Sequence, residues 1–143
     1  MSRVLFVEDD ADTREVVSLM LLRAGFELDT AANGRDALAL TIQKPPDVLL
    51  LDLALPQMDG VALVRVLRSY LRWASIPVVV LTAMAGSPLM DEITGLHVTR
   101  ILLKGSATFD HILAALRDAL DKPPPSGKPN NPEDWRPDEA SPL

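Results

Sequence analysis

The stretch Asp47-Val48-Leu49-Leu50-Leu51-Asp52 decides the fold of this chain. Its four consecutive aliphatic residues lie between Pro45-Pro46 and Pro56, and such a short, bounded apolar run predicts a strand that is buried on both faces. Ligands of an open parallel sheet bind outside the carboxyl ends of its central strands, so Asp52 is a candidate reactive group. A single Asp after a strand is also a common turn former or helix cap, so the rest of the chain must decide between these roles.

Segments that read as strands alternate with segments that read as helices. The expected strands cover residues 3–7, 26–31, 47–51, 77–81 and 101–103, and the expected helices cover 12–24, 35–44, 61–73, 87–94 and 107–121. Alternating units of this kind predict a parallel sheet with right-handed crossovers and helices on both faces. The expected fold class is α/β, with a doubly wound, flavodoxin-like sheet of five parallel strands in the order 2-1-3-4-5 and five helices.

The third expected helix, residues 61–73, separates apolar from basic side chains. Its apolar side carries Leu63, Leu67, Tyr70 and Leu71, and its other side carries Arg65, Arg68 and Arg72. We interpret these arginines as a solvated face, with a partner-binding stripe as the alternative.

Composition limits the classes of function. The 143 residues suit one domain, and 48% of them are hydrophobic. A net charge of -6 argues against direct binding of nucleic acid, because phosphates require a basic face. The chain has no cysteine for a disulfide or a thiolate metal site. No apolar run reaches the roughly 18 residues of a membrane span, so we expect a cytoplasmic protein without membrane association.

The composition changes at Lys122. Seven of the chain's twelve prolines lie between this residue and Leu143, and aliphatic residues become few. We expect residues 1–121 to form the folded domain and residues 122–143 to form a disordered, proline-rich tail or linker.

Four of the expected strands end in polar side chains at the same edge of the sheet. In chain order these are Glu8, Asp9 and Asp10, then Asp52, Thr82 and Lys104. Carboxylates that lie close together repel one another unless a cation intervenes. An all-oxygen ligand set without clustered His or Cys selects a hard divalent cation, Mg2+ above all. A carboxylate that faces a phosphoryl donor can act as the nucleophile and form an aspartyl phosphate.

This constellation resembles the receiver domain of response regulators in two-component signalling, and in particular the chemotaxis-regulator-like receivers. The resemblance covers about residues 2–121 and rests on four segments: Val7-Glu8-Asp9-Asp10, the run LLDLALPQMDG at residues 50–60, Leu81-Thr82-Ala83 and Leu103-Lys104. It implies a signalling domain that catalyses only its own phosphorylation and dephosphorylation, rather than a conventional enzyme.

The resemblance also implies roles for the acids. Asp52 would be the phosphoacceptor, Asp9 would bind Mg2+ directly, and Glu8 would bind it through water. Ala54 would offer its backbone carbonyl to the metal. Asp10 would cap the first helix, with a supporting role at the metal as the alternative.

The two remaining site residues, Thr82 and Lys104, would bind the phosphoryl group and respond to its presence. Thr82 and Lys104 match the family residues that sense and hold it. The phosphoryl donor would be a sensor histidine kinase or a phosphotransfer protein. The fourth helix, fifth strand and fifth helix would then rearrange and change the affinity for a downstream effector.

Three residues depart from the family pattern. Gly105 replaces the proline that usually follows the lysine in this family, and the peptide bond before that proline is often cis. A cis bond without proline costs about 2.5–4 kcal/mol, so a cis bond is not expected before Gly105. Ile101 replaces the aromatic switch residue and has no ring to move between buried and exposed states. Arg100 replaces an acid of the dimer interface in one transcription-factor subfamily, so that dimer is not expected here.

Two classes of function stay open. The first is a phosphorylation-dependent switch; the second is a receiver fold used as a scaffold or binding module without phosphorylation, which Ile101 and Gly105 favour. A dinucleotide binder would need a glycine-rich phosphate loop, and the chain has no G-x-G. A haloacid-dehalogenase type of phosphatase would need a second Asp two residues after Asp52, where Ala54 stands.

The lifetime of the phosphorylated state can be predicted from two positions. In the family these positions tune the attack of water on the acyl phosphate, and here they are Ala54 and Met84. Neither side chain can orient a water by hydrogen bonding, so we expect a comparatively long-lived phosphoprotein. Loss of label from the purified, phosphorylated protein measures this lifetime, and rapid loss without a phosphatase would contradict the expectation.

Overall fold

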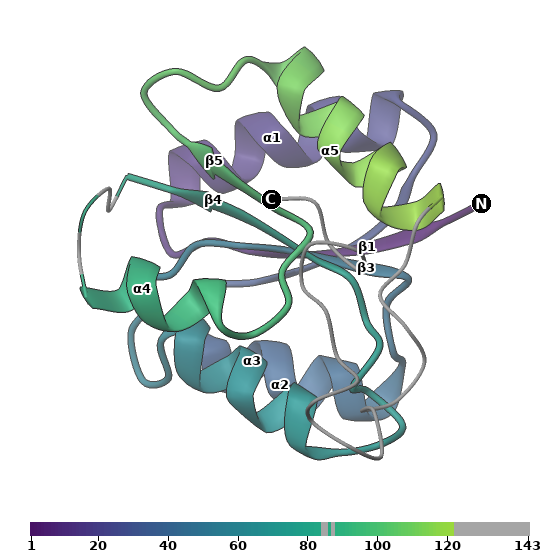
Figure 1. Ribbon diagram of the computed structural model, residues 1–143. Helices are drawn as coiled ribbons and strands as arrows, with labels where there is room; N and C mark the ends of the chain where they lie inside the picture. The colour runs from purple at the N-terminus through teal and green to yellow at the C-terminus, as the bar shows by residue number, and fades with distance from the viewer. Residues whose placement is uncertain (84–85, 87, 122–143) are drawn as a thin grey trace.

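The computed structural model describes residues 1–83, 86 and 88–121. Within them, strands and helices alternate as β1 (Arg3–Val7), α1 (Ala11–Arg23), β2 (Glu27–Ala31), α2 (Gly34–Gln43), β3 (Val48–Leu51), α3 (Gly60–Ser69), β4 (Val78–Thr82), α4 (Pro88–Thr94), β5 (Arg100–Leu103) and α5 (Phe109–Asp121). The sheet is parallel, with strand order β2-β1-β3-β4-β5 (Figure 1). The expected fold class and strand order are therefore confirmed. None of the described helices has the length and apolar character needed to cross a membrane.

Strand β3 lies at the centre of the sheet and is buried on both faces. All four of its residues, Val48 to Leu51, are 0% exposed. Because side chains alternate across a strand, Leu49 and Leu51 pack on the side of α2, α3 and α4, whereas Val48 and Leu50 pack on the side of α1 and α5. Figure 1 shows the corresponding two helical layers, with α1 and α5 on one side of the sheet and α2 and α3 on the other.

Side-chain caps fix the start of the helices that approach the carboxyl edge of the sheet. The carboxylate of Asp10 accepts hydrogen bonds from the backbone N–H of Thr13 at 2.8 Å and from its hydroxyl at 2.5 Å. This bonding pattern is that of an N-cap, so α1 begins at Ala11 and the capping role expected for Asp10 is confirmed. Asp59 caps α3 in the same way.

Helix α3 ends at Ser69 rather than at Trp73, so the expected length of this helix was wrong. Tyr70 is the C-cap residue and has an extended backbone, with φ -111° and ψ 127°. Residues after this point no longer follow the helical repeat. Tyr70 and Leu71 are therefore exposed instead of continuing the apolar side of the helix.

Arg68 is buried, which contradicts the interpretation of this residue as part of a solvated face. Its guanidinium donates to the carbonyl oxygens of Leu96 at 3.0 Å, Ala74 at 3.1 Å and Ile76 at 2.8 Å. These oxygens belong to the connection between α3 and β4 and to the turn between α4 and β5. Burial lowers the pKa of Arg68 to about 10. Arg68 thus ties together two connections at the end of the sheet where β4 and β5 begin.

Replacing Arg68 should destabilise the domain strongly. In Arg68→Met, buried carbonyl groups lose their donors, and we expect the free energy of unfolding to fall by about 2–4 kcal/mol. Arg65→Met on the same helix is the matched control, because Arg65 is exposed and pairs with Glu92 at 3.6 Å. The control should change stability by less than about 0.5 kcal/mol. Urea unfolding followed by circular dichroism measures both, and equal effects would contradict the role assigned to Arg68.

Candidate functional site

The carboxyl ends of four strands meet at one edge of the sheet. Backbone hydrogen bonds continue one residue beyond the strands and hold the polar residues there in register. The N–H of Asp52 donates to the carbonyl oxygen of Val7 at 3.1 Å, and the N–H of Lys104 donates to that of Thr82 at 3.0 Å. The residues expected to converge at this edge are therefore neighbours in space.

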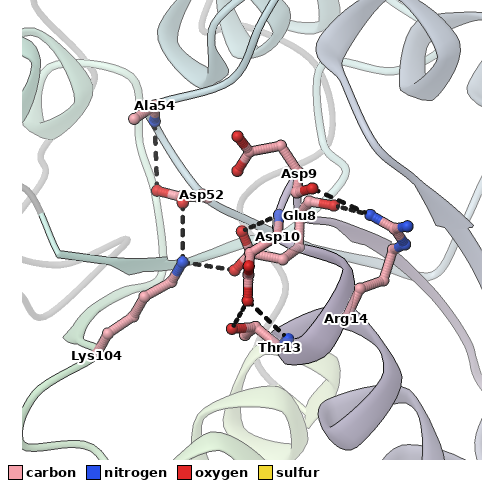
Figure 2. Close-up of polar contacts among 8 residues, drawn as sticks. All are labelled: Glu8, Asp9, Asp10, Thr13, Arg14, Asp52, Ala54 and Lys104. Atoms are coloured by element: carbon pink, nitrogen blue, oxygen red, sulfur yellow. Dashed lines mark hydrogen bonds and ion pairs between the residues drawn. The ribbon is translucent and has the colours of Figure 1, made fainter.

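Three carboxylates form a cluster at this edge. Glu8, Asp9 and Asp52 each offer one oxygen, and these oxygens lie within 4.8 Å of one another. Asp10 is engaged elsewhere, because its carboxylate caps α1 (Figure 2). The hydroxyl and amide of Thr13 hold the pKa of Asp10 below its usual value. The structure thus separates Asp10 from the other three acids.

The ammonium group of Lys104 lies between two of these carboxylates (Figure 2). Its Nζ is 2.9 Å from Oδ2 of Asp52 and 2.5 Å from Oε1 of Glu8. The contact with Asp52 is a hydrogen bond, whereas Oε1 of Glu8 is a buried atom that accepts no well-directed one. Partial burial lowers the pKa of Lys104, but the contacts with Glu8 and Asp52 outweigh it and raise the pKa above its usual value.

Glu8 is the most deeply buried of the three acids, with 1% of its surface exposed. Burial raises the pKa of Glu8, and this effect exceeds the lowering by Lys104 and by the N–H of Asp10, which donates to Oε2 at 3.3 Å. An ionised Glu8 therefore depends on a cation close to it.

Asp52 is nearly buried and its carboxylate is held at both oxygens. Oδ1 accepts from the N–H of Ala54 at 3.3 Å, and Oδ2 accepts from Lys104. The loop after Asp52 packs closely on α3 at Gly60. A Cβ atom at that position would lie 2.4 Å from Cδ1 of Leu51 and 2.6 Å from the carbonyl oxygen of Asp52. Gly60 therefore lets α3 begin directly beside the segment that carries Asp52.

The three departures from the family pattern lie in β5 or directly after Lys104. Gly105 is exposed, and the described part of the chain contains no cis peptide bond, so the Lys104–Gly105 bond is trans. Ile101 is half-buried and packs on the side of α2, α3 and α4. Arg100 pairs with Asp118 of α5 in the same chain, at 3.4 Å. Met84 lies outside the described residues.

Arg14 also contacts the acidic loop of this site, and we did not predict this contact from the sequence. Its guanidinium donates to the carbonyl oxygens of Glu8 at 2.7 Å and of Asp9 at 3.4 Å (Figure 2). A signal for this was present in the sequence. Side chains of an α-helix point back toward its N-terminus, so a long cation in the first turns after Asp10 can reach the acidic loop.

The donor set suits a hard divalent cation. Glu8, Asp9 and Asp52 offer only carboxylate oxygens, and the carbonyl of Ala54 follows in the same loop. Mg2+ prefers oxygen ligands of this kind. The Oε1 of Glu8 is buried and lies 2.5 Å from the ammonium of Lys104, so a divalent cation in this cluster would face the Glu8 carboxylate together with Lys104. The cluster is typical of the Mg2+ site of receiver domains.

Comparison with known proteins identifies the family. The family model for the response regulator receiver domain matches residues 4–117. The chain is 39% identical over 95 residues to the DNA-binding dual master transcriptional regulator RpaA of Synechocystis sp., covering 66% of this chain and 39% of RpaA. It is 37% identical over 95 residues to the DNA-binding response regulator MtrA of Mycolicibacterium paratuberculosis, covering 66% of this chain and 40% of MtrA. The chain thus spans about two fifths of the length of these curated relatives.

Solved structures agree with this assignment. The chemotaxis response regulator CheY4 of Vibrio cholerae superposes with a TM-score of 0.76 at 32% identity, covering 84% of this chain and 99% of CheY4. The fold and the acidic pocket define a receiver of two-component signal transduction. The chain belongs to the response regulator receiver domain family, whose members are signalling phosphoacceptors rather than conventional enzymes.

The close packing at Gly60 predicts the effect of a single methyl group. We expect Gly60→Ala to lower the free energy of unfolding by about 2–3 kcal/mol, because the methyl group overlaps Leu51 and the backbone of Asp52. Gly105→Ala is the matched control, since a Cβ there meets nothing within 4 Å. The control should be neutral or stabilise by up to about 1 kcal/mol. Urea unfolding of both variants tests this, and a tolerant Gly60 would contradict the close approach.

Proposed function

We propose that this chain is a phosphorylation-dependent receiver in which Asp52 accepts a phosphoryl group from a sensor histidine kinase or a phosphotransfer protein. The observation that carries the proposal is the state of the Asp52 carboxylate. The residue Asp52 is 6% exposed, and its carboxylate lies in a cluster of three acids and accepts a hydrogen bond from the ammonium of Lys104 at 2.9 Å. A carboxylate that is oriented in this way, close to a cation, is prepared for nucleophilic attack on a phosphoryl donor.

In the proposed reaction, an oxygen of Asp52 attacks the phosphorus of a phosphohistidine. The new P–O bond forms as the P–N bond breaks, and its electron pair returns to the imidazole of the donor. The transferring oxygens carry negative charge, which the nearby ammonium of Lys104 stabilises. The hydroxyl of Thr82 would donate a hydrogen bond to one of these oxygens.

Mg2+ is the proposed cofactor of this site. Its ligands would come from Asp9, Asp52 and the backbone carbonyl of Ala54, with Glu8 acting through water. When bound, Mg2+ supplies positive charge that neutralises the phosphoryl oxygens and relieves the repulsion among the carboxylates. In this proposal Asp52 is the nucleophile, and Lys104 and Thr82 bind the oxygens of the transferred phosphoryl group.

The proposed output is a change in partner affinity on the face formed by α4, β5 and α5. Lys104 follows β5 directly, and its N–H is bonded to the carbonyl oxygen of Thr82 at the end of β4. A charge change at Asp52 therefore acts on residues that are joined to this face through the backbone. An effector protein is the proposed partner.

We further propose that residues 1–121 are the receiver and that residues 122–143 serve as a tail or linker. Their proline-rich composition supports this division. Two relatives carry DNA-binding in their names, but they are much longer than this chain, and its net charge of -6 gives no reason to transfer that activity.

Phosphorylation of Asp52 can be tested by mass spectrometry. With Mg2+ and acetyl phosphate, the protein should gain the mass of one phosphoryl group, and Asp52→Asn should abolish the gain because amide nitrogen and oxygen cannot replace the carboxylate nucleophile. Asp121→Asn is a matched control, since this acid lies at the end of α5, beside Ser2 at the opposite edge of the sheet. The control should be phosphorylated normally.

The alternative function is a receiver-fold scaffold that acts without phosphorylation, which the residues at Ile101 and Gly105 favour. It would be supported if neither acetyl phosphate nor beryllofluoride modified the wild-type protein in the presence of Mg2+. A mass gain that survives in Asp52→Asn would instead move the phosphoacceptor to another residue.

A further inference from the structure

The loop that carries the acidic pair lies just beyond the paired part of the sheet. The pairing of β1 with β2 ends at Val7 and Ala31, and one further bond joins the N–H of Glu8 to the carbonyl oxygen of Ala31 at 3.0 Å. From this point the carbonyl groups of Glu8 and Asp9 turn toward Arg14 instead of a neighbouring strand.

Arg14 reaches these carbonyl groups from the first turns of α1. Its own N–H donates to the carbonyl oxygen of Asp10 at 2.9 Å, so its backbone is fixed by the helix that Asp10 caps. Its side chain then runs back toward the N-terminus of the helix, as helical side chains do. One nitrogen of the guanidinium contacts the oxygens of both Glu8 and Asp9.

The two carbonyl groups flank a single Cα atom, that of Asp9. One belongs to the peptide plane before this atom and the other to the plane after it. Holding both planes restricts φ and ψ of Asp9 and therefore the direction of its Cα–Cβ bond. This restriction matters because the Asp9 side chain is exposed, whereas Glu8 is fixed by burial.

We propose that Arg14 is a positioning residue that aims the carboxylate of Asp9 at the divalent cation through the backbone. This inference rests on the proposed Mg2+ site. The role is geometric and opposes the electrostatic effect of the same side chain, because a guanidinium close to the site repels a divalent cation. The two effects predict opposite results when Arg14 is removed. Mg2+ binding weakens if Arg14 acts mainly by positioning Asp9, and it tightens if Arg14 acts only through its positive charge.

Calorimetric titration of the full chain with Mg2+ alone separates these accounts. Arg14→Gln should bind Mg2+ about tenfold more weakly, as is usual when a residue that orients a metal ligand is lost. Arg14→Lys should lose about threefold, because an ammonium keeps the charge but lacks the fixed, planar donors of a guanidinium. Arg23→Gln is the matched control: it removes the same charge from the exposed last turn of the same helix. Its affinity should stay within about twofold of wild type.

The outcomes distinguish this inference from the function on which it rests. Absence of saturable Mg2+ binding in the wild-type protein would overturn the proposed function and the role of Arg14 together. Wild-type binding with an Arg14→Gln affinity that is equal or tighter would overturn the role of Arg14 alone. Urea unfolding of the metal-free variants controls for folding. If Arg14→Gln does not fold, Arg14→Lys decides: weaker binding supports the proposal and equal binding overturns it.

Discussion

The contact of one ammonium group with two nearly buried carboxylates is the interaction on which this site depends. Glu8 and Asp52 are 1% and 6% exposed, and the repulsion between them would be severe without Lys104. The parallel sheet brings the three residues together, because β1, β3 and β5 all end at the same edge. A divalent cation in the cluster would face Glu8 and Asp52 together with Lys104, so that one set of acids would have two cationic partners.

The chain stabilises two cations, the half-buried Lys104 and the buried Arg68, in opposite ways. Lys104 pairs with carboxylates, and its pKa is raised; Arg68 is surrounded by carbonyl oxygens, and burial lowers its pKa to about 10. Carboxylates at an open edge can exchange one cation for another, whereas backbone carbonyls in two chain connections cannot move without unfolding them. Lys104 is thus suited to a changing site and Arg68 to a fixed framework, at opposite ends of the same two strands.

Sequence reasoning succeeded for the strands and their order, where a local pattern determines three-dimensional position. The apolar run before Asp52 predicted a central strand, and parallel pairing then placed Glu8, Asp9 and Lys104 beside it. It failed at Arg68, because helical periodicity cannot reveal the carbonyl oxygens of Leu96 and Ala74, which other segments bring to the guanidinium. It also missed Arg14, because a helical arginine close to acids reads first as a solvated charge.

The proposed path from the site to the α4, β5 and α5 face depends on what replaces the aromatic switch residue. Ile101 is half-buried on the side of α4 and has no ring to swing outward. The backbone offers a different connection: Thr82 is paired with Leu103, and its carbonyl oxygen accepts from the N–H of Lys104 at 3.0 Å. If phosphorylation of Asp52 draws Thr82 and Lys104 together, both movements reach β5 through one ladder. In the proposed switch, Ile101 would remove a side-chain relay, while the backbone ladder of β4 and β5 would still connect the site to the proposed output face.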